Sequence, residues 1–228
     1  MKIDCISDLH GYLPKLEGGD LLIIAGDMTA RDTEEEWGKF EHWLTEQNYE
    51  EKIIIAGNHD NFLNSMDEDE MWQHWCRVGV TYLCDSFTEF RGLKIWASPW
   101  SLWFHGINPK CKAFTGSEND LQKKYDLIPN FPDFIDILIT HGPPFGTLDE
   151  CSNGSVGSKS LMKCITKVLP EMVIFGHIHE QGGKYVQKEG VLYINGSIVD
   201  EKYRNVNPRR RIIFDEKMPK MQRIKRIE

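Results

Sequence analysis

The sequence lacks an apolar run long enough to cross a membrane. Its longest uninterrupted apolar stretches, Leu21–Ala25 and Ile53–Ala56, have the length of strands, whereas a membrane-spanning helix needs about 20 apolar residues. The chain also passes from Met1 to Asp4 and Asp8 without the apolar segment of a secretory signal. We therefore expect a cytoplasmic protein with no membrane partner.

The sequence lacks the cysteine spacing of a metal finger or a redox pair. The six cysteines, at positions 5, 76, 84, 111, 151 and 164, make neither a CxxC pair nor the spacing of a zinc finger. This excludes a structural zinc site built on thiolates, and a chain of this length needs no disulfide framework. We expect reduced thiols, most of them buried.

Positive charge is scarce over most of the chain. Lys and Arg number 27 against 35 Asp and Glu, and residues 201–228 hold ten of the basic side chains but only four of the acidic ones. Without a broad basic face, we expect no long nucleic acid as a partner. The basic tail fits the solvated face of closing strands such as Arg211–Asp215, with a nucleic-acid or membrane patch as the alternative.

The length and the apolar pattern predict one α/β domain. A chain of 228 residues with 40% hydrophobic and 27% charged residues is ordinary for a globular protein, and we expect a single domain over 1–228. Short apolar runs that end in a polar residue recur and indicate buried strands. These runs are Ile3–Ser7, Leu21–Gly26, Ile53–Gly57, Leu93–Ala97, Ile135–Thr140, Val173–Gly176 and Leu192–Asn195.

Helical spacing lies between several of the predicted strands. Residues 33–47 and 158–169 have apolar side chains at helical intervals, and 67–76 repeat the pattern less regularly. Thr33 and Glu36 have the spacing of a capping box. The alternation of strands and helices predicts α/β layers.

Residues 97–132 depart from this alternation. They contain four prolines among several aromatics and glycines, which is typical of loops. We expect a long surface excursion there. After Leu192 the pattern changes to strands without helices, which predicts a hairpin or meander that closes a sheet.

Metal-binding residue types follow five of the predicted strands. The blocks are Asp8-Leu9-His10, Gly26-Asp27, Gly57-Asn58-His59-Asp60, His141-Gly142 and Gly176-His177-Ile178-His179. Loops at the carboxyl ends of strands in an α/β sheet converge on one crevice, so these blocks can share a site. Each block alone also fits a turn or a helix cap. His177 and His179 alternate on an expected extended segment, which would point both imidazoles to the same side.

These side chains suit divalent ions such as Mn, Fe or Zn. They are more than one ion can use, and two ions about 3.5 to 4 Å apart would employ them all. The candidate ligands are Asp8, His10, Asp27, Asn58, His141, His177 and His179. Asp27 is the natural bridge, because a carboxylate can give one oxygen to each ion and the preceding glycine allows a close approach of the backbone.

The order of the blocks resembles that of the calcineurin-like metallophosphoesterases, which carry D-x-H, GD, GNH(D/E), H and GHxH. The resemblance extends over residues 4–197. Ala97–Trp100, His141–Pro144 and Asn195–Ser197 further resemble the branch of metallophosphoesterase-domain-containing proteins, which includes small phosphodiesterases. The resemblance implies a four-layer αββα sandwich of two mixed sheets flanked by helices, with a dinuclear metal site at the carboxyl ends of the strands.

The resemblance also implies how the ligands divide. One ion would be held by Asp8, His10, Asp27 and His179, and the other by Asp27, Asn58, His141 and His177. No block departs from the family pattern. By the same resemblance, His59 lies beside the phosphate as the catalytic residue that is not a metal ligand. Asp60 either orients His59 or only caps the turn.

The expected reaction is hydrolysis of a small phosphate ester, with a nucleotide-like phosphodiester as the first candidate substrate. Two dications lower the pKa of a bridging water, so that hydroxide attacks phosphorus, and they offset the charge of the phosphoryl oxygens. The alternatives are a phosphomonoesterase, including a phosphoprotein phosphatase, and a nucleotide-binding metalloprotein with little turnover. The oligomeric state is left open.

Aromatic residues in the loops are candidates to line the cleft. An aromatic face can stack on a nucleobase, although apolar packing is the more common role of such residues. The four candidates are Trp100, Trp103, Phe104 and Phe145.

Overall fold

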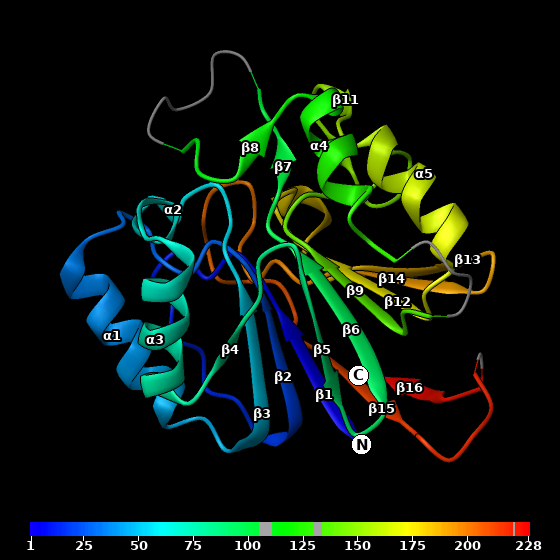
Figure 1. Cartoon of the computed structure of the whole chain (residues 1–228), viewed down its shortest axis with the longest axis horizontal. Helices are drawn as coiled ribbons and strands as arrows, with labels where there is room; N and C mark the ends of the chain where they lie inside the picture. Colours follow the sequence, from blue (N-terminus) through cyan, green and yellow to red (C-terminus); the bar gives the residue numbers. More distant parts are fainter. Residues whose placement is uncertain (105–110, 130–133, 221) are drawn as a thin grey trace.

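The computed structural model describes residues 1–104, 111–129, 134–220 and 222–228. Within these ranges the chain forms two six-stranded mixed sheets and two small two-stranded ones (Figure 1). The first large sheet has antiparallel strands at one edge of a parallel set, and the second has an antiparallel strand at each edge. This combination allows helices to cover the outer faces while short hairpins close the edges.

The first large sheet has the order β16-β15-β1-β2-β3-β4. Its strands are β1 (Lys2–Ile6), β2 (Gly19–Ala25), β3 (Tyr49–Ile55), β4 (Thr81–Tyr82), β15 (Arg210–Phe214) and β16 (Ile224–Ile227). Strands β1 to β4 run parallel, β15 is antiparallel to β1, and β16 is antiparallel to β15. The basic tail thus contains the predicted closing hairpin.

The second large sheet has the order β13-β14-β12-β9-β6-β5. Its strands are β5 (Ser86–Phe90), β6 (Leu93–Ser98), β9 (Ile137–Thr140), β12 (Met172–Phe175), β13 (Tyr185–Lys188) and β14 (Val191–Asn195). The four central strands are parallel, and β5 and β13 are antiparallel at the edges. The small sheets pair β7 (Ser101–Leu102) with β8 (Thr115–Gly116) and β10 (Glu150–Cys151) with β11 (Gly154–Ser155).

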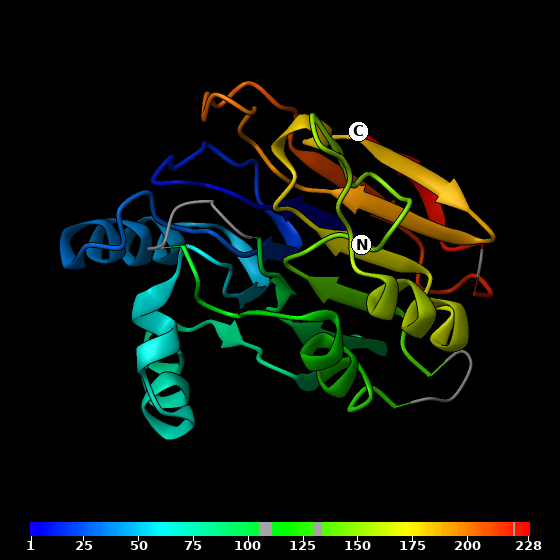
Figure 2. The same cartoon turned by 90° about the horizontal axis from the view of Figure 1, so that it is seen from above.

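Helices cover the outer face of each large sheet. The covering helices are α1 (Glu34–Thr45) and α3 (Glu68–Val78) on the first sheet and α4 (Glu118–Tyr125) and α5 (Lys159–Val168) on the second. The short helix α2 (Asn61–Ser65) and the 3₁₀ turn η1 (His179–Gln181) lie instead in the loops after β3 and β12. Figures 1 and 2 show α1 and α3 on one flank of the molecule and α4 and α5 on the other. Among the described residues, no helix has the length and apolar character needed to cross a membrane.

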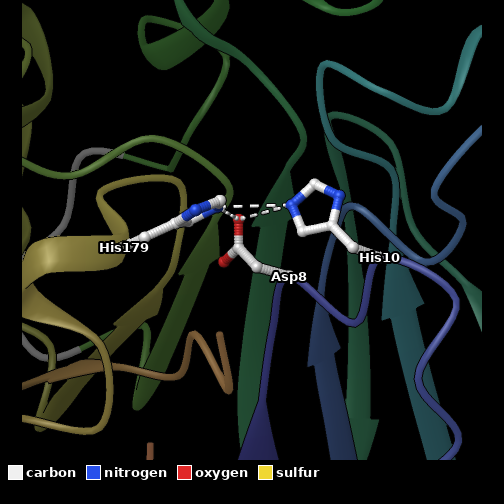
Figure 3. A group of neighbouring side chains, drawn as sticks. All are labelled: Asp8, His10 and His179. Carbon is white, nitrogen blue, oxygen red and sulfur yellow. Dashed lines mark hydrogen bonds and ion pairs between the residues drawn. The ribbon is translucent and has the colours of Figure 1, made fainter. Parts of the chain in front are cut away.

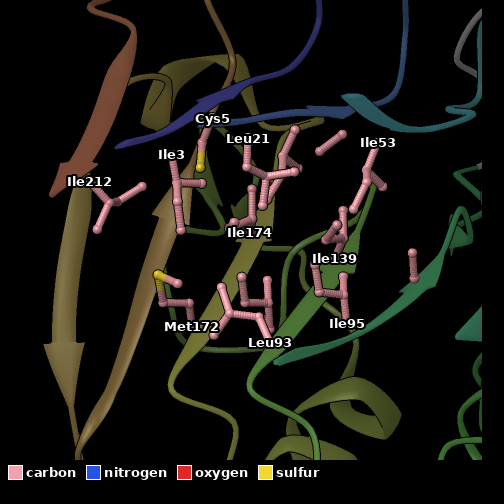
Figure 4. Packing of buried hydrophobic residues seen from close by; sticks show 14 of the residues in the cluster. Ile3, Cys5, Leu21, Ile53, Leu93, Ile95, Ile139, Met172, Ile174 and Ile212 are labelled. Carbon is pink, nitrogen blue, oxygen red and sulfur yellow. The ribbon is translucent and has the colours of Figure 1, made fainter. Parts of the chain in front are cut away.

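Three apolar clusters hold these layers together. One lies between α1, α3 and the first sheet, and another lies between α4, α5 and the second sheet. The third lies between the two sheets, where Ile3 and Leu21 of the first sheet face Ile95 and Ile174 of the second (Figure 4). The layer order is helix, sheet, sheet, helix, which confirms the predicted αββα sandwich.

The three predicted helices form where a polar side chain caps them. Thr33, Asp67 and Ser158 each accept a hydrogen bond from the backbone N–H three residues further on. The predicted capping box at Thr33 is only half formed. The Glu36 carboxylate accepts from the N–H of Arg31 at 2.7 Å and not from that of Thr33.

Residues 97–132 contain a helix that their composition did not predict. In the described part of this stretch, β7 pairs with β8 and α4 packs against α5, with Leu121 and Tyr125 buried. Ser117 and Asp120 form a complete capping box at the start of α4. The remainder of the predicted excursion, 105–110 and 130–132, lies outside the described residues.

Candidate metal centre

The two large sheets meet at the carboxyl ends of their central strands. The Ser7 N–H donates to the carbonyl of Gly196 at 2.7 Å, and the Ile198 N–H donates to the carbonyl of Ser7 at 3.0 Å. These bonds join the end of β1 to the segment that follows β14. Loops from β1, β2 and β3 therefore face loops from β9 and β12 across one shared edge.

One group of donor atoms consists of Asp8, His10 and His179 (Figure 3). The Oδ1 atom of Asp8 lies 3.2 Å from Nε2 of His179 and 4.0 Å from Nε2 of His10. The two Nε2 atoms are 3.3 Å apart. Donors bound to one ion at about 2.1 Å lie about 3.0 to 3.4 Å apart, so two of these three spacings fit a common cation and the third is longer.

The second group is built around Asp27. Its Oδ2 atom lies 3.4 Å from Nε2 of His141 and 3.8 Å from Nε2 of His10. Nε2 of His141 is in turn 3.0 Å from Oδ1 of Asn58. Asp27 thus lies between His10 of the first group and His141 of the second. A carboxylate in this place can contribute to two neighbouring cation sites.

His177 lies beside these donors in a different manner. Its ring centroid is 5.0 Å from that of His141, and its backbone N–H donates to both Asp8 oxygens at 2.9 and 3.1 Å. The prediction that His177 and His179 alternate on an extended segment was wrong. His177 has a φ of +69° and His179 begins the 3₁₀ turn η1, so a tight turn directs the two rings.

The backbone around the site is strained and leaves no room for a Cβ atom at Gly57 or Gly176. Asp8 and Asp27 have φ values of +52° and +57°, a region that non-glycine residues occupy at a cost, commonly at functional sites. A Cβ on Gly57 would lie 2.2 Å from Oδ1 of Asp27, and one on Gly176 would lie 2.1 Å from Oδ2 of Asp8. Both glycines are therefore needed for the carboxylates to occupy their places.

Burial and charge set the protonation of the site. Burial opposes the charged forms of Asp8 and Asp27, but the histidines around them lower the pKa of both carboxyls. Burial likewise opposes charge on His141, but Asp27 and Asp8 raise its pKa to about 9. For His10 burial dominates and lowers the pKa to about 4. Carboxylates and neutral imidazoles are the forms that bind cations.

Asp60 forms its hydrogen bonds with the backbone. Its carboxylate accepts from the N–H groups of Gly57 at 2.7 Å, Asp27 at 2.9 Å and Met28 at 3.1 Å. Its side chain makes no cap hydrogen bond to α2, the helix that it precedes. Asp60 therefore holds the loop after β2 against the loop after β3, which fixes Asp27 relative to Asn58.

His59 faces the second donor group with one edge of its ring. Its Nε2 atom lies 3.9 Å from Oδ2 of Asp27, and its backbone N–H donates to Oδ1 of Asp27 at 2.9 Å. Its Nδ1 atom lies 3.4 Å from Sγ of Cys111. The ring is only partly buried, with 17% of the side chain exposed.

A cavity of about 380 Å³ opens over these residues. Of the four aromatic candidates, Trp103 and Phe104 line it. Trp100 instead donates its indole N–H to Asp85 at 3.0 Å. Phe145 lies under the ammonium group of Lys159, 5.1 Å from its ring centroid.

Sequence reasoning missed several cavity residues, among them Tyr203, Cys111 and Lys112. The ring of Tyr203 lies edge-to-face with those of His10 and His179, with centroids 4.8 and 5.0 Å apart. The Lys112 ammonium lies 5.6 Å from the Trp103 ring centroid. None of the three belongs to a motif, so their role depends on tertiary structure alone.

A family model described as calcineurin-like phosphoesterase matches residues 1–181. The chain is 35% identical over 233 residues to human metallophosphoesterase domain-containing protein 1, a match that covers 90% of this chain and 68% of that protein. It is 32% identical over 240 residues to a UPF0046 protein of Caenorhabditis elegans, with 94% and 80% covered.

Solved structures share the fold at low identity. Against TT1561 of Thermus thermophilus the TM-score is 0.62 at 14% identity, with 87% of this chain and 89% of that chain covered. Against the phosphopantetheinyl hydrolase of Mycobacterium tuberculosis it is 0.56 at 17% identity, with 96% and 98% covered. The human relative confirms the resemblance to the metallophosphoesterase-domain-containing branch. The chain belongs to the calcineurin-like phosphoesterase family.

Proposed function

We propose that this chain uses two divalent ions to hydrolyse small phosphodiesters. In these substrates one of the two groups esterified to the phosphate is nucleotide-like. Family membership supports phosphoester hydrolysis by a metal-dependent enzyme. The observation that carries the proposal is the placement of Asp27 between His10 and His141, at 3.8 and 3.4 Å. Two groups of donors that share one carboxylate suit a pair of ions.

The donor set fits such ions in chemistry as well as in number. One ion would be held by Asp8, His10, Asp27 and His179, and the other by Asp27, Asn58, His141 and His177. Imidazole, carboxylate and amide ligands without thiolate suit manganese, iron or zinc. When bound, the ions would activate water and offset negative charge on the phosphoryl oxygens.

The side chains of the protein position the substrate and donate hydrogen bonds to it. In the net reaction, the oxygen of water joins phosphorus, the bond to the leaving oxygen breaks, and that oxygen leaves with the electron pair and gains a proton from water. His59 lines the cavity with its Nε2 atom 3.9 Å from Oδ2 of Asp27, and from this side it would donate a hydrogen bond to the leaving oxygen. Asp60 keeps His59 and Asp27 in register through the backbone.

The cavity favours a substrate with a flat group beside the phosphate. Trp103 is 42% exposed and Tyr203 is 48% exposed, and both line the cavity. Exposed aromatic faces stack on a base, and the nearby Lys112 supplies a positive charge for an anionic ligand. A volume of about 380 Å³ suits a mononucleotide-sized molecule.

The test is hydrolysis of matched phosphodiesters and monoesters by protein loaded with manganese, iron or zinc. We expect diesters to be preferred over monoesters. His59→Ala should retain both ions while its kcat falls at least about 100-fold. Asp27→Ala should lose both its metal and its activity. Preference for monoesters would favour the phosphatase alternative. Undiminished activity of Asp27→Ala would contradict the shared carboxylate.

A further inference from the structure

The two nitrogens of His59 have different neighbours. Nε2 faces the donor group around Asp27, whereas Nδ1 lies 3.4 Å from Sγ of Cys111. This spacing is within hydrogen-bond range for sulfur. Cys111 also lines the cavity, so the second polar contact of the His59 ring is made by a thiol that no motif contains.

The chemistry of a thiol determines which atom donates. A thiol has one proton to give and a sulfur that accepts weakly. Burial, with the charges of Asp27 and Asp32, raises the pKa of Cys111 to about 11, so the sulfur retains its proton at neutral pH. When a neighbouring group donates a hydrogen bond to Nδ1, that nitrogen acts as the acceptor and carries no proton. The ring proton of a neutral imidazole then resides on Nε2.

We propose that Cys111 is a positioning residue that donates its S–H to Nδ1 of His59 and so directs the Nε2–H of that ring toward the leaving oxygen. This inference rests on the proposed function. It specifies how His59 acts there, as a hydrogen-bond donor whose tautomer is fixed by a thiol.

The rest of the site supports this assignment. Asp60, the carboxylate next to His59 in sequence, accepts from three backbone N–H groups. The ring of His59 lies edge-to-face with those of His10 and Tyr203, with centroids 4.7 and 6.5 Å apart. These contacts restrict the ring's orientation. The polar neighbours of the two nitrogens differ, because Sγ of Cys111 lies 3.4 Å from Nδ1 and Oδ2 of Asp27 lies 3.9 Å from Nε2.

The first experiment measures kcat on a series of methyl aryl phosphates whose leaving phenols differ in acidity. A donor to the leaving oxygen matters most when that oxygen is a poor leaving group. We expect Cys111→Val to lower kcat about three- to tenfold for the phenyl ester. We expect little change for the 4-nitrophenyl ester and an unchanged KM for both.

Two variants complete this series. Cys111→Ser retains a side chain that donates to Nδ1, so it should restore the wild-type dependence on the leaving group. Cys76→Val removes an exposed thiol on α3 and should behave as wild type. An equal loss for all esters in Cys111→Val would mean that Cys111 only supports the structure, and would overturn the inference.

The second experiment does not depend on turnover. Nitrogen-15 NMR of histidine-labelled protein, with zinc and without it, reports which imidazole nitrogen carries the proton, and His59→Ala identifies the signal. We expect the spectra to show the Nε2–H tautomer in wild type and in Cys111→Ser, and a mixture of tautomers in Cys111→Val. An Nδ1–H tautomer in wild type would overturn the inference.

The two proposals fail in different ways. If no phosphate ester is hydrolysed by the metal-loaded wild type, the proposed function fails, and the NMR result still decides the tautomer. If hydrolysis requires His59 but the leaving-group dependence of Cys111→Val equals that of wild type, only the role of Cys111 fails.

Discussion

His141 is a residue at which a proton and a cation compete. Its Nε2 atom lies within 3.4 Å of Asp27 and 3.0 Å of Asn58, and only the unprotonated nitrogen can bind a metal. Burial disfavours its charge, yet the neighbouring carboxylates raise its pKa to about 9. In the metal-free protein the ring is therefore protonated at neutral pH.

We predict that metal binding releases protons at neutral pH. A group with its pKa near 9 holds its proton below that pH, so zinc affinity should rise with pH and level off above about pH 9. Asp8 and Asp27 contribute no protons, because their pKa values are lowered. Calorimetry in two buffers of different ionisation enthalpy measures the release. Binding without proton release at neutral pH would contradict the protonation of His141.

Gly57 shows how one absent side chain shapes the site. A Cβ there would lie 2.2 Å from Oδ1 of Asp27 and 2.7 Å from Cε1 of His141. We predict that Gly57→Ala lowers zinc affinity about tenfold or more, because Asp27 must move. The control is Gly38→Ala on α1, where a Cβ meets nothing within 4 Å. It should leave affinity unchanged and raise stability by about 0.5–1 kcal/mol. Equal affinities in the two variants would refute the steric argument.

Among the helices, α5 has its N-terminal N–H groups bound by a carboxylate from another helix. Glu118 of α4 accepts from the N–H groups of Lys159 and Ser160 at 2.8 and 3.1 Å, and from the Ser160 hydroxyl at 2.7 Å. A negative charge at a helix N-terminus meets unpaired N–H groups and the positive end of the helix dipole. Glu118 thereby links the 97–132 stretch to the outer layer of the second sheet.

We predict that Glu118→Ala lowers the free energy of unfolding by about 1.5–3 kcal/mol. Urea denaturation followed by circular dichroism gives the value. Glu35→Ala on α1 removes an exposed carboxylate paired with Lys39 and should cost much less, because water screens an exposed ion pair. A loss for Glu118→Ala as small as that for Glu35→Ala would show that the inter-helix contact contributes nothing.

Elements with a regular apolar pattern were predictable, and α4 was not. The strands appear because continuous apolar runs suit positions buried on both faces, and α1, α3 and α5 carry apolar stripes behind polar N-caps. The eight residues of α4 include only two buried side chains, Leu121 and Tyr125. Its stability depends on packing against α5 and the second sheet, which a local pattern does not contain.

The convergence of the site was predictable, but its finer geometry was not. Each block follows a strand, and parallel strands bring their ends together. The turn at His177 depends on its N–H donating to Asp8, 169 residues away in sequence. Cys111 and Tyr203 reach the cavity only through tertiary structure, so no spacing in the sequence indicates them.

At the scale of the whole molecule, a buried ion pair joins the two ends of the chain. Asp4 of β1 accepts from Nε and Nη2 of Arg211 on β15, at 2.7 and 2.6 Å, and also from the hydroxyl of Tyr49. The side chains of Asp4 and Arg211 are 8% and 12% exposed. Because both side chains have little contact with water, removal of Arg211 would leave the negative charge of Asp4 without its ion-pair partner.

We predict that Arg211→Met destabilises the protein by about 3–5 kcal/mol. Arg226→Met on β16 removes an exposed arginine paired with Glu228 and should cost under about 1 kcal/mol. Thermal and urea unfolding of both variants provide the comparison. If the two variants unfold alike, the Asp4–Arg211 pair contributes no more than a surface pair.

The division of the donors between the two sheets has a mechanical consequence. Asp8, Asp27 and Asn58 follow strands of one sheet, and His141, His177 and His179 follow strands of the other. A cation held from both sides would add a reversible cross-link between layers that also pack through apolar side chains and hydrogen-bond at this edge. One sheet could then slide along the other only after the ion has dissociated. The rigidity of the two-sheet sandwich would therefore increase with the fraction of metal sites that are occupied.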